Sequence, residues 1–429
     1  MLSRLIYGRI LFPSSKLSCY EQSTKLYEQP NFELQHIYRA LDVLAKESDN
    51  IQATLYKNSK RIIKRKTGVL YYDCTNYFFD IDSEDGSKQY GVSKEHRPNP
   101  IVQMGLFMDM SGIPLAFCIN PGNQNEQLSL KPLEQQIMKD FELSKFVVCT
   151  DAGLSSESNR KFNNFGERSF ITAQSIKKLN NNLKEWCLDP TGWSLEKHKK
   201  KYDISKLEDT PENKKKTFYK EKLIEGYDEE RDIEFNQTLI VTYSLKYKEY
   251  QTNIRARQIQ RAEKKVYALD LDTIAEEAKY DGFYAVCTNL DDDPAVIAKI
   301  NHNRWKIEES FRIMKSEFKA CPVYLHDDNR IEAHFLTCFI SLLIYRLLEK
   351  KLDDKFTCDE IISTIRNMNV TTVGENGFIP AYTRTILTDT LHDTFRFNTD
   401  YQYMTDRNLK GLTLSLIHIS EPTRLQLIS

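Results

Sequence analysis

The 429-residue sequence lacks the features that mark several classes of protein. Its nine cysteines contain no Cys-x-x-Cys pair, Cys321, Cys338 and Cys358 are widely scattered, and the eight histidines do not stand beside cysteines at ligand spacing. A structural zinc site is therefore not indicated. An odd number of unpatterned cysteines is typical of reduced thiols in a cytoplasmic protein.

The sequence also lacks strong charge of one sign and long apolar runs. The net charge is −1, so a nucleic-acid partner would have to be bound by local basic patches. The N-terminus has no signal-peptide organisation, and the longest uncharged apolar run, 335–345, is too short to span a bilayer. The sequence thus predicts a cytoplasmic protein with no membrane partner. Its length allows two or three domains.

The order of expected elements predicts an α/β fold. A helical segment ends in a basic run at 60–66, which either binds phosphates or is a solvated helix face. The pattern then changes to apolar runs rich in Val, Tyr and Phe, which are typical of buried strands. The expected order after residue 67 is strand 68–80, strands 101–110 and 113–120, helix 128–143, strand 145–150, helix 155–165 and strand 169–175. This is the order of a ribonuclease-H-like mixed sheet with helices.

A highly charged segment interrupts this pattern. Alternating residues at 217–224 and 238–247 predict half-exposed strands, and 255–265 predicts a basic helical edge. We therefore expect a mostly β insertion subdomain, in which Trp186 and Trp193 either stack on a base or form the core. The expected divisions are 1–66 (helical N-terminal segment), 67–180 (first part of the catalytic core), 181–281 (insertion), 282–352 (second part of the core), 353–413 (helical tail) and 414–429.

The segment 301–318 predicts one amphipathic helix. Arg304, Glu308 and Lys315 share one edge, and the neighbouring edge is apolar through Ile307, Phe311, Met314 and Phe318. A surface helix with an arginine–glutamate i,i+4 pair would give the same pattern.

Two aspartates could meet Glu308. Asp73 lies in the first expected strand and Asp151 directly follows the strand 145–150. Three converging carboxylates repel one another and usually hold divalent cations, and two Mg²⁺ ions about 4 Å apart suit phosphodiester displacement. The alternatives are a strand-end turn for Asp73 and a helix cap for Asp151.

Three motifs resemble those of a known family: DCTN at Asp73, TDAGLSS at Asp151, and R-x3-E-x6-K over Arg304, Glu308 and Lys315. They are similar to the catalytic boxes of DDE transposases of bacterial insertion sequences, in the group with a Tyr-Arg-Glu-Lys signature and a β-rich insertion. The phrases GVSKEHRPNPIVQMGLFMDMSGIPLAF, PGNQNEQLSLKP and WKIEESFRIMKSEF extend the resemblance over about residues 10–352.

The resemblance implies that Asp73, Asp151 and Glu308 are catalytic and bind Mg²⁺ or Mn²⁺, with two ions expected. It implies DNA contacts by Arg304 and Lys315, to which we add Arg312 on the same helix and Asn301, which stands where the signature has tyrosine.

The implied reaction is cleavage at the transposon ends followed by attack of the 3′-hydroxyl on target DNA. The expected partners are terminal inverted repeats, target DNA and a second copy of the chain. The alternatives are a transposase-derived fragment that binds DNA without catalysis and a ribonuclease-H-like nuclease without strand transfer. Both ends are expected to be incomplete, because SLIHISEPTR near the C-terminus resembles a translated sequencing adapter and the family usually has a DNA-binding region ahead of the catalytic domain.

Overall fold

A computed structural model of the chain describes residues 1–410 apart from 25, 28, 265–269, 375–376 and 401–402. The expected non-native stretch 414–429 lies outside the described residues. The chain forms two compact units. Unit 1 consists of Met1–Thr67, Asp73–Leu143 and the chain from Lys306 onward, and unit 2 consists of Gly68–Tyr72 and Ser144–Trp305.

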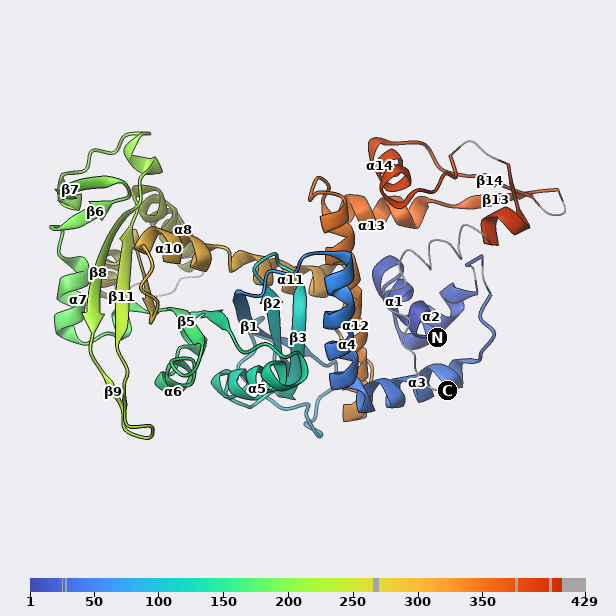
Figure 1. Cartoon of the computed structure of the whole chain (residues 1–429), viewed down its shortest axis with the longest axis horizontal. Helices are drawn as coiled ribbons and strands as arrows, with labels where there is room; N and C mark the ends of the chain where they lie inside the picture. The colour runs from blue at the N-terminus through green and yellow to red at the C-terminus, as the bar shows by residue number, and fades with distance from the viewer. Residues whose placement is uncertain (25, 28, 265–269, 375–376, 401–402, 411–429) are drawn as a thin grey trace. The chain divides into compact units, whose positions relative to one another are not determined.

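Unit 1 begins with helices that pack on a long buried helix, α12. The N-terminal helices are α1 (Leu2–Leu11), α2 (Lys16–Ser23), α3 (Leu34–Lys46) and α4 (Ser48–Ile62). Helix α12 (Asp328–Lys351) contacts α1, α3 and β3 (Pro114–Pro121) and runs beside β3 and α4 (Figure 1). It is long and apolar enough to cross a membrane, but 78% of its most apolar window is buried inside the protein. Burial among helices and strands accounts for its apolar composition.

The basic run that ends the N-terminal segment contains a structural residue. Arg65 forms an ion pair with Asp109 at 2.5 Å, and both side chains are almost fully buried. Its guanidinium also donates to Ser59 Oγ and to the carbonyls of Ile113 and Pro114. Arg65 is therefore part of the core of unit 1.

The remainder of unit 1 holds one edge of the main sheet and the C-terminal elements. Strand β2 (Ile101–Asp109) pairs antiparallel with β3 through the turn at 110–112, and β1 (Val69–Phe78) lies on the other side of β2. The three-stranded sheet β13-β14-β15 lies in the C-terminal tail. The other elements of unit 1 are α5 (Leu130–Asp140), α11 (Trp305–Ser316), α13 (Cys358–Asn367), β13 (Val370–Val373), β14 (Gly377–Pro380), α14 (Ile386–Phe395) and β15 (Met404–Thr405).

In unit 2 the first residues of β1 begin a sheet that continues through the insertion. Residues Val69–Tyr71 pair parallel with β4 (Phe146–Thr150), and β4 pairs parallel with β5 (Arg168–Ala173). The order then runs β5-β12-β11-β8-β6-β7. The order β3-β2-β1-β4-β5, with β1, β4 and β5 parallel, is that of a ribonuclease-H-like sheet, so the α/β fold prediction is confirmed.

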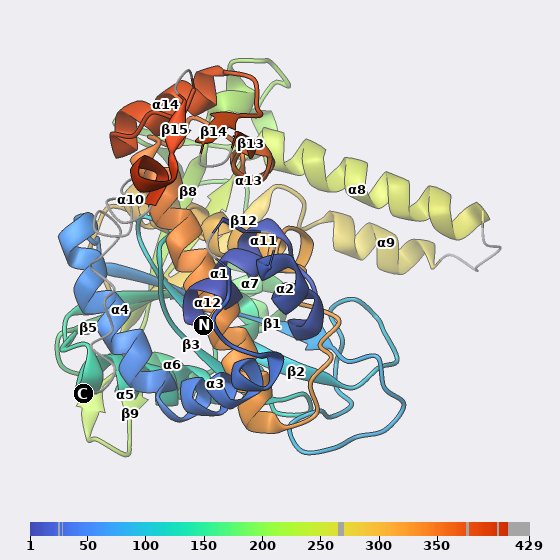
Figure 2. The ribbon, with the colours of Figure 1, turned by 90° about the vertical axis from the view of Figure 1, so that its right-hand side faces the viewer.

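The insertion extends this sheet with antiparallel strands and, among its described residues, also carries the helices α7, α8 and α9. Trp193 is fully buried and Trp186 packs beside it, so both belong to the core of unit 2. The expected basic helical edge falls on α8, which extends with α9 away from the strands of this unit (Figure 2). The elements of unit 2 besides β1, β4 and β5 are α6 (Glu157–Phe162), α7 (Asn181–Leu188), β6 (Trp193–Leu195), β7 (His198–Tyr202), β8 (Phe218–Ile224), β9 (Tyr227–Asp228), β10 (Ile233–Glu234), β11 (Gln237–Tyr243), α8 (Leu245–Lys264), α9 (Leu271–Ala278), β12 (Phe283–Thr288) and α10 (Pro294–His302).

Candidate active site

The two aspartates occupy equivalent places on neighbouring strands. Tyr71 of β1 pairs with Cys149 of β4 in a parallel register. Asp73 is two residues beyond Tyr71, and Asp151 is two residues beyond Cys149. Asp73 Oδ1 accepts a 2.7 Å hydrogen bond from the backbone N–H of Cys74, and the Asp73 side chain is half-buried. Each aspartate thus follows its own member of this strand pair by the same number of residues.

Asp151 caps the short 3-10 helix that follows β4. Its Oδ1 accepts from the backbone N–H groups of Gly153 and Leu154 at 2.9 and 3.0 Å. The helix-cap alternative for Asp151 is thus realised in the structure, but Oδ2 takes no part in these two bonds. A carboxylate held by two backbone N–H groups has a fixed orientation, and its second oxygen can accept a cation.

The segment 301–318 is two helices, so the prediction of a single helix was wrong. Helix α10 ends at His302, and α11 begins at Trp305. The backbone N–H of Asn303 bonds to the carbonyls of Lys299 and Ile300, and that of Arg304 bonds to the carbonyl of Asn301. These tightened turns end α10. Asn301 and Arg304 consequently lie outside α11.

Unit 2 places Asn301, Arg304 and Asp151 near Tyr284 of β12. Asn301 is buried, and its Nδ2 donates to the Tyr284 hydroxyl at 2.9 Å. Burial raises the pKa of Tyr284; the bond from Asn301 and the charge of Arg304 oppose this rise, and the charge of Asp151 adds to it. Sequence reasoning missed Tyr284, because nothing in the strand pattern distinguishes it from other tyrosines. Its hydroxyl stands beside the residue that replaces the signature tyrosine.

In unit 1, α11 has the expected apolar and charged faces. Ile307, Phe311, Met314 and Phe318 are buried, whereas Glu308 is exposed in the first turn. Lys315 Nζ donates to Glu95 Oε1 at 2.9 Å and lies 5.4 Å from the centre of the Tyr77 ring. Arg312 is exposed and bonds to Glu309 at 3.4 Å.

A second lysine of unit 1, Lys94, lies close to Asp73. Burial lowers the pKa of Lys94, but the charges of Asp73 and Glu126 outweigh burial, so the pKa is raised overall. Lys94 Nζ is 3.2 Å from Glu126 Oε1 and also donates to the carbonyl of Cys74. Lys94 stands in the phrase GVSKEHRPNP, but its loop position gave no periodic pattern that would have identified it.

A different group of possible metal ligands lies in the C-terminal tail of unit 1. Among the described residues, Asp389, His392 and Asp400 have ligand atoms within 4.8 Å of one another. His392 Nδ1 is 2.8 Å from Asp400, and Arg384 Nε is 2.5 Å from Asp389 and 3.8 Å from Asp400. Arg384 forms ion pairs with both carboxylates, so these contacts give the cluster a structural role that anchors α14.

A mixed sheet of this order, with Asp73 within β1 and Asp151 directly after the adjacent parallel strand β4, is that of a ribonuclease-H-like protein. The family model described as the transposase DDE domain matches residues 64–344, which is more than half of the chain, so the chain belongs to that family. No curated protein matches the chain. A matching solved structure is that of a piggyBac transposase synaptic complex with hairpin DNA, with 8% identity, a TM-score of 0.41 and coverage of 85% of this chain and 79% of that chain.

Proposed function

We propose that this transposase cleaves DNA at the terminal repeats of an insertion sequence and joins the freed 3′-hydroxyl to target DNA. The observation that supports the proposal is the parallel pairing of β1 with β4, because Asp73 and Asp151 each stand two residues beyond the paired Tyr71 and Cys149. Membership of the transposase DDE domain family supports DNA as the substrate. We further propose that two copies act together and that the reaction takes place in the bacterial cytoplasm.

The donor set fits a hard divalent cation. Asp73, Asp151 and Glu308 offer only carboxylate oxygens, which Mg²⁺ and Mn²⁺ prefer, and DDE transposases generally depend on divalent metal. Two such ions, when bound, would activate the attacking oxygen and stabilise the leaving one. Asp151 contributes to this site a carboxylate whose orientation is set by two backbone N–H groups.

The basic residues near these carboxylates have separate roles in the proposal. Arg304 and Lys315 bind backbone phosphates, with Asn301 and Arg312 as further DNA contacts. Lys94 balances the charge of Asp73 while no nucleic acid is present. Glu95 binds Lys315 when no nucleic acid is present, so a phosphate would have to displace the Glu95 carboxylate from Lys315.

Cleavage and joining by the full chain test the proposed reaction. We expect Mg²⁺ or Mn²⁺, but not a chelator, to support nicking of DNA that carries the element's ends. Pre-cut ends should then give joined products with plasmid DNA. Nicking without joined product would show a ribonuclease-H-like nuclease, and DNA binding without metal-dependent nicking would show a non-catalytic fragment.

Lys315 and Glu95 give opposite predictions for DNA affinity. Lys315→Ala should weaken binding of end DNA and reduce the slope of log K against log salt by about one, because one phosphate contact is lost. Glu95→Gln should strengthen binding, because the carboxylate that competes for Lys315 is removed. Fluorescence anisotropy over a salt series measures both effects.

Lys350 provides a matched control for this pair. It is a lysine of α12 in the same unit and forms an i,i+4 pair with Asp354 at 2.6 Å. Lys350→Ala should leave the salt slope unchanged. Equal slopes for wild type and Lys315→Ala would remove Lys315 from the phosphate contacts.

A further inference from the structure

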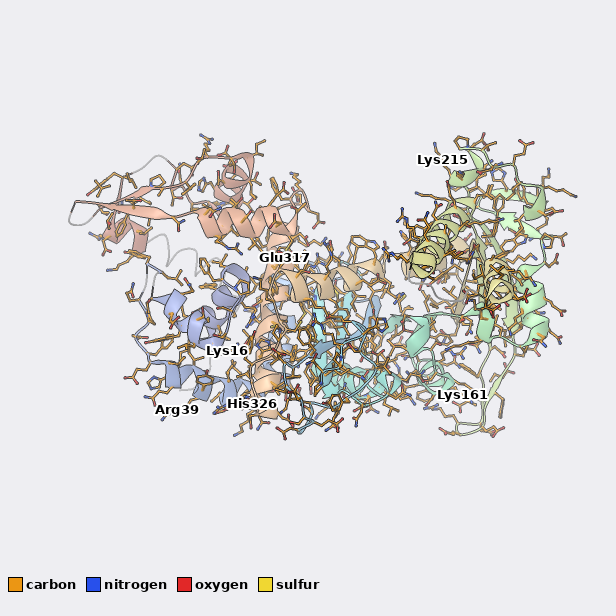
Figure 3. The ribbon with its side chains drawn as sticks, turned by 180° about the vertical axis from the view of Figure 1, so that it is seen from behind. Lys16, Arg39, Lys161, Lys215, Glu317 and His326 are labelled. Carbon is orange, nitrogen blue, oxygen red and sulfur yellow. The ribbon has the colours of Figure 1, made fainter. Side chains whose placement is uncertain are left out.

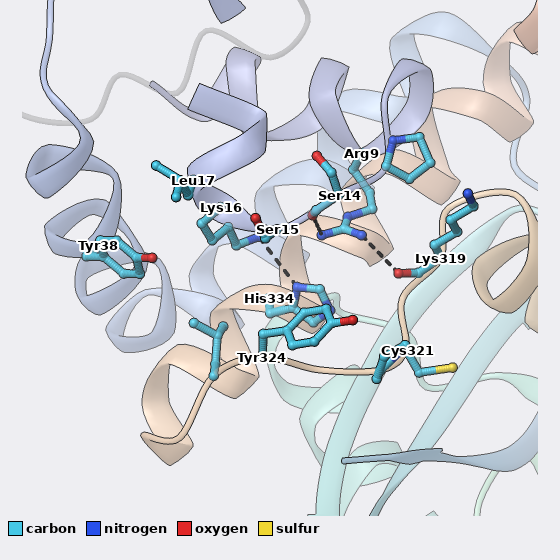
Figure 4. Close-up of a pocket in the computed structure, with 13 residues that line it drawn as sticks. Arg9, Ser14, Ser15, Lys16, Leu17, Tyr38, Lys319, Cys321, Tyr324 and His334 are labelled. Atoms are coloured by element: carbon cyan, nitrogen blue, oxygen red, sulfur yellow. Dashed lines mark hydrogen bonds between the residues drawn. The ribbon is translucent and has the colours of Figure 1, made fainter. Parts of the chain in front are cut away.

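A basic cavity lies within unit 1, and none of the candidate catalytic or DNA-binding residues lines it. It has a volume of about 400 Å³ and is bordered by the end of α1, the start of α2, the loop 319–325 and α12. Figure 4 shows Arg9, Lys16 and His334 along it, with Lys319 and Tyr324 at the side of the loop. Figure 3 shows Lys16 within the helical segment that carries Arg39 on its surface.

Two cations of this cavity are buried. Arg9 is 5% exposed and Lys16 is 6% exposed. Arg9 donates from Nη1 to the carbonyls of Phe318 and Lys319, but within the described part of the chain its buried Nε has no hydrogen-bond partner. Lys16 Nζ lies 3.4 Å from Nδ1 of His334, and no carboxylate pairs with it among the residues that the structure describes. Both side chains thus retain donor capacity inside the protein.

The histidine of this cluster is neutral and does not balance the charge. Burial, together with the charges of Lys16 and Arg9, holds the pKa of His334 well below its ordinary value. Its Nε2 lies 3.0 Å from the carbonyl of Ala320. With Nε2–H donating to that carbonyl, Nδ1 is the acceptor for the Lys16 ammonium.

No carboxylate lines the cavity among the residues that the structure describes. The charged and titratable groups that act on Lys16 are Arg9 of α1, Cys19 of α2 and Cys338 of α12. Burial, and then Arg9, lower the pKa of Lys16 to about 8, so the ammonium is still charged at neutral pH. Buried charge without a counter-ion is costly, and a bound anion would remove that cost.

We propose that this cavity binds a phosphate group of a DNA strand. The Arg9 guanidinium and the Lys16 ammonium would donate to the phosphate oxygens, with exposed Lys319 as a third cation at the rim. The ring of Tyr324 is 67% exposed at the same cavity, and an aromatic ring beside a basic site is the arrangement that holds a base of single-stranded DNA. The choice of DNA over a free phosphate rests on the proposed function.

Lys16→Met is the decisive variant, because methionine fills a similar volume without charge. Removing an uncompensated buried charge should raise the melting temperature of the ligand-free chain. The same change should abolish any rise in melting temperature caused by inorganic phosphate. A purely structural lysine would give the opposite result for the first measurement, since its loss would lower the melting temperature.

The pH dependence provides an independent readout. The folded pKa of Lys16, about 8, lies below its ordinary value of 10.5, so the unfolded chain binds more protons between these values. Without phosphate, wild-type stability should therefore rise between pH 8 and 10.5 relative to Lys16→Met. Phosphate should flatten this difference, because it stabilises the charged form of Lys16.

The experiment measures thermal unfolding in phosphate and in chloride at equal ionic strength, and binding of a short single-stranded DNA. Wild type should be stabilised by phosphate, and Lys16→Met should lose about tenfold in DNA affinity, as expected for one charged hydrogen bond. Lys57→Met, at an exposed lysine of α4, should behave as wild type. Tyr324→Ala should weaken DNA binding but leave the phosphate response intact.

The outcomes separate this inference from the proposed reaction. No phosphate response in wild type, or an equal response in Lys16→Met, overturns the anion site even if metal-dependent nicking is observed. A phosphate response with unchanged DNA affinity in both variants overturns DNA as the source of the phosphate. Loss of both responses in Lys16→Met supports the inference even in a chain that does not nick DNA.

Discussion

Glu308→Gln is expected to lower metal-dependent cleavage of end DNA by about 10³-fold. The substitution keeps the size of the side chain but removes the charge that a divalent ion requires, and transition-state stabilisation by bound metal amounts to several kcal/mol. Glu308 is exposed, and an ion pair at an exposed position contributes at most about 1 kcal/mol, so the stability of the chain should change by no more than about 1 kcal/mol. Single-turnover cleavage over a range of Mn²⁺ concentrations measures the effect.

The neighbouring Glu309 is a matched control on the same helix. Its Oε2 bonds to Arg346 at 2.9 Å, and Arg346 is a buried residue of α12. Glu309→Gln should therefore lower stability by about 1–3 kcal/mol, because a charged hydrogen bond is weakened, while cleavage persists below the melting temperature. Full activity of Glu308→Gln would exclude Glu308 as a metal ligand.

Arg65→Met is expected to destabilise unit 1 by about 3–5 kcal/mol, because it leaves the carboxylate of Asp109 buried without its cation. The backbone N–H groups of Ser111 and Ile113 would still bond to Asp109 at 2.9 and 3.1 Å. These bonds hold the turn between β2 and β3, so the loss should appear there. Hydrogen exchange of the β2 and β3 amides, together with a urea titration, measures the change.

The double variant Arg65→Met/Asp109→Asn distinguishes the ion pair from general packing. It should be more stable than the sum of the two single variants predicts, because neither charge is then left unpaired. Lys64→Met, at an exposed residue of the same basic run, should change stability by less than about 0.5 kcal/mol. Equal effects of Lys64→Met and Arg65→Met would show that the run contributes through its total charge.

The sequence by itself determined most of the elements. Apolar runs before polar turns located β1, β2, β3 and β4, and their order predicted the ribonuclease-H-like sheet. Asp293 and Pro294 predicted the start of α10, where Asp293 accepts from the N–H of Ala295. Such local patterns determine elements because period, capping and turn chemistry act over a few residues.

Within 301–318, the sequence determined the faces of α11 but not its beginning. The residues of its apolar edge are all buried, as the period of 3.6 predicts. The turn at Asn303 and Arg304 was not predicted, because this segment has no proline or glycine and its periodicity continues through the break. Asn301 belongs to α10, where its side chain is buried and donates to Tyr284 of β12.

Only the tertiary structure decided which charged residues are buried and what they contact. Arg65 and Lys64 are neighbours in one basic run, yet Arg65 is enclosed with Asp109 and Lys64 is exposed. Lys16 and His334 are 318 residues apart in the sequence but meet in one cavity. The free energy of a charge depends on its burial and its partners, and contacts between distant segments set both.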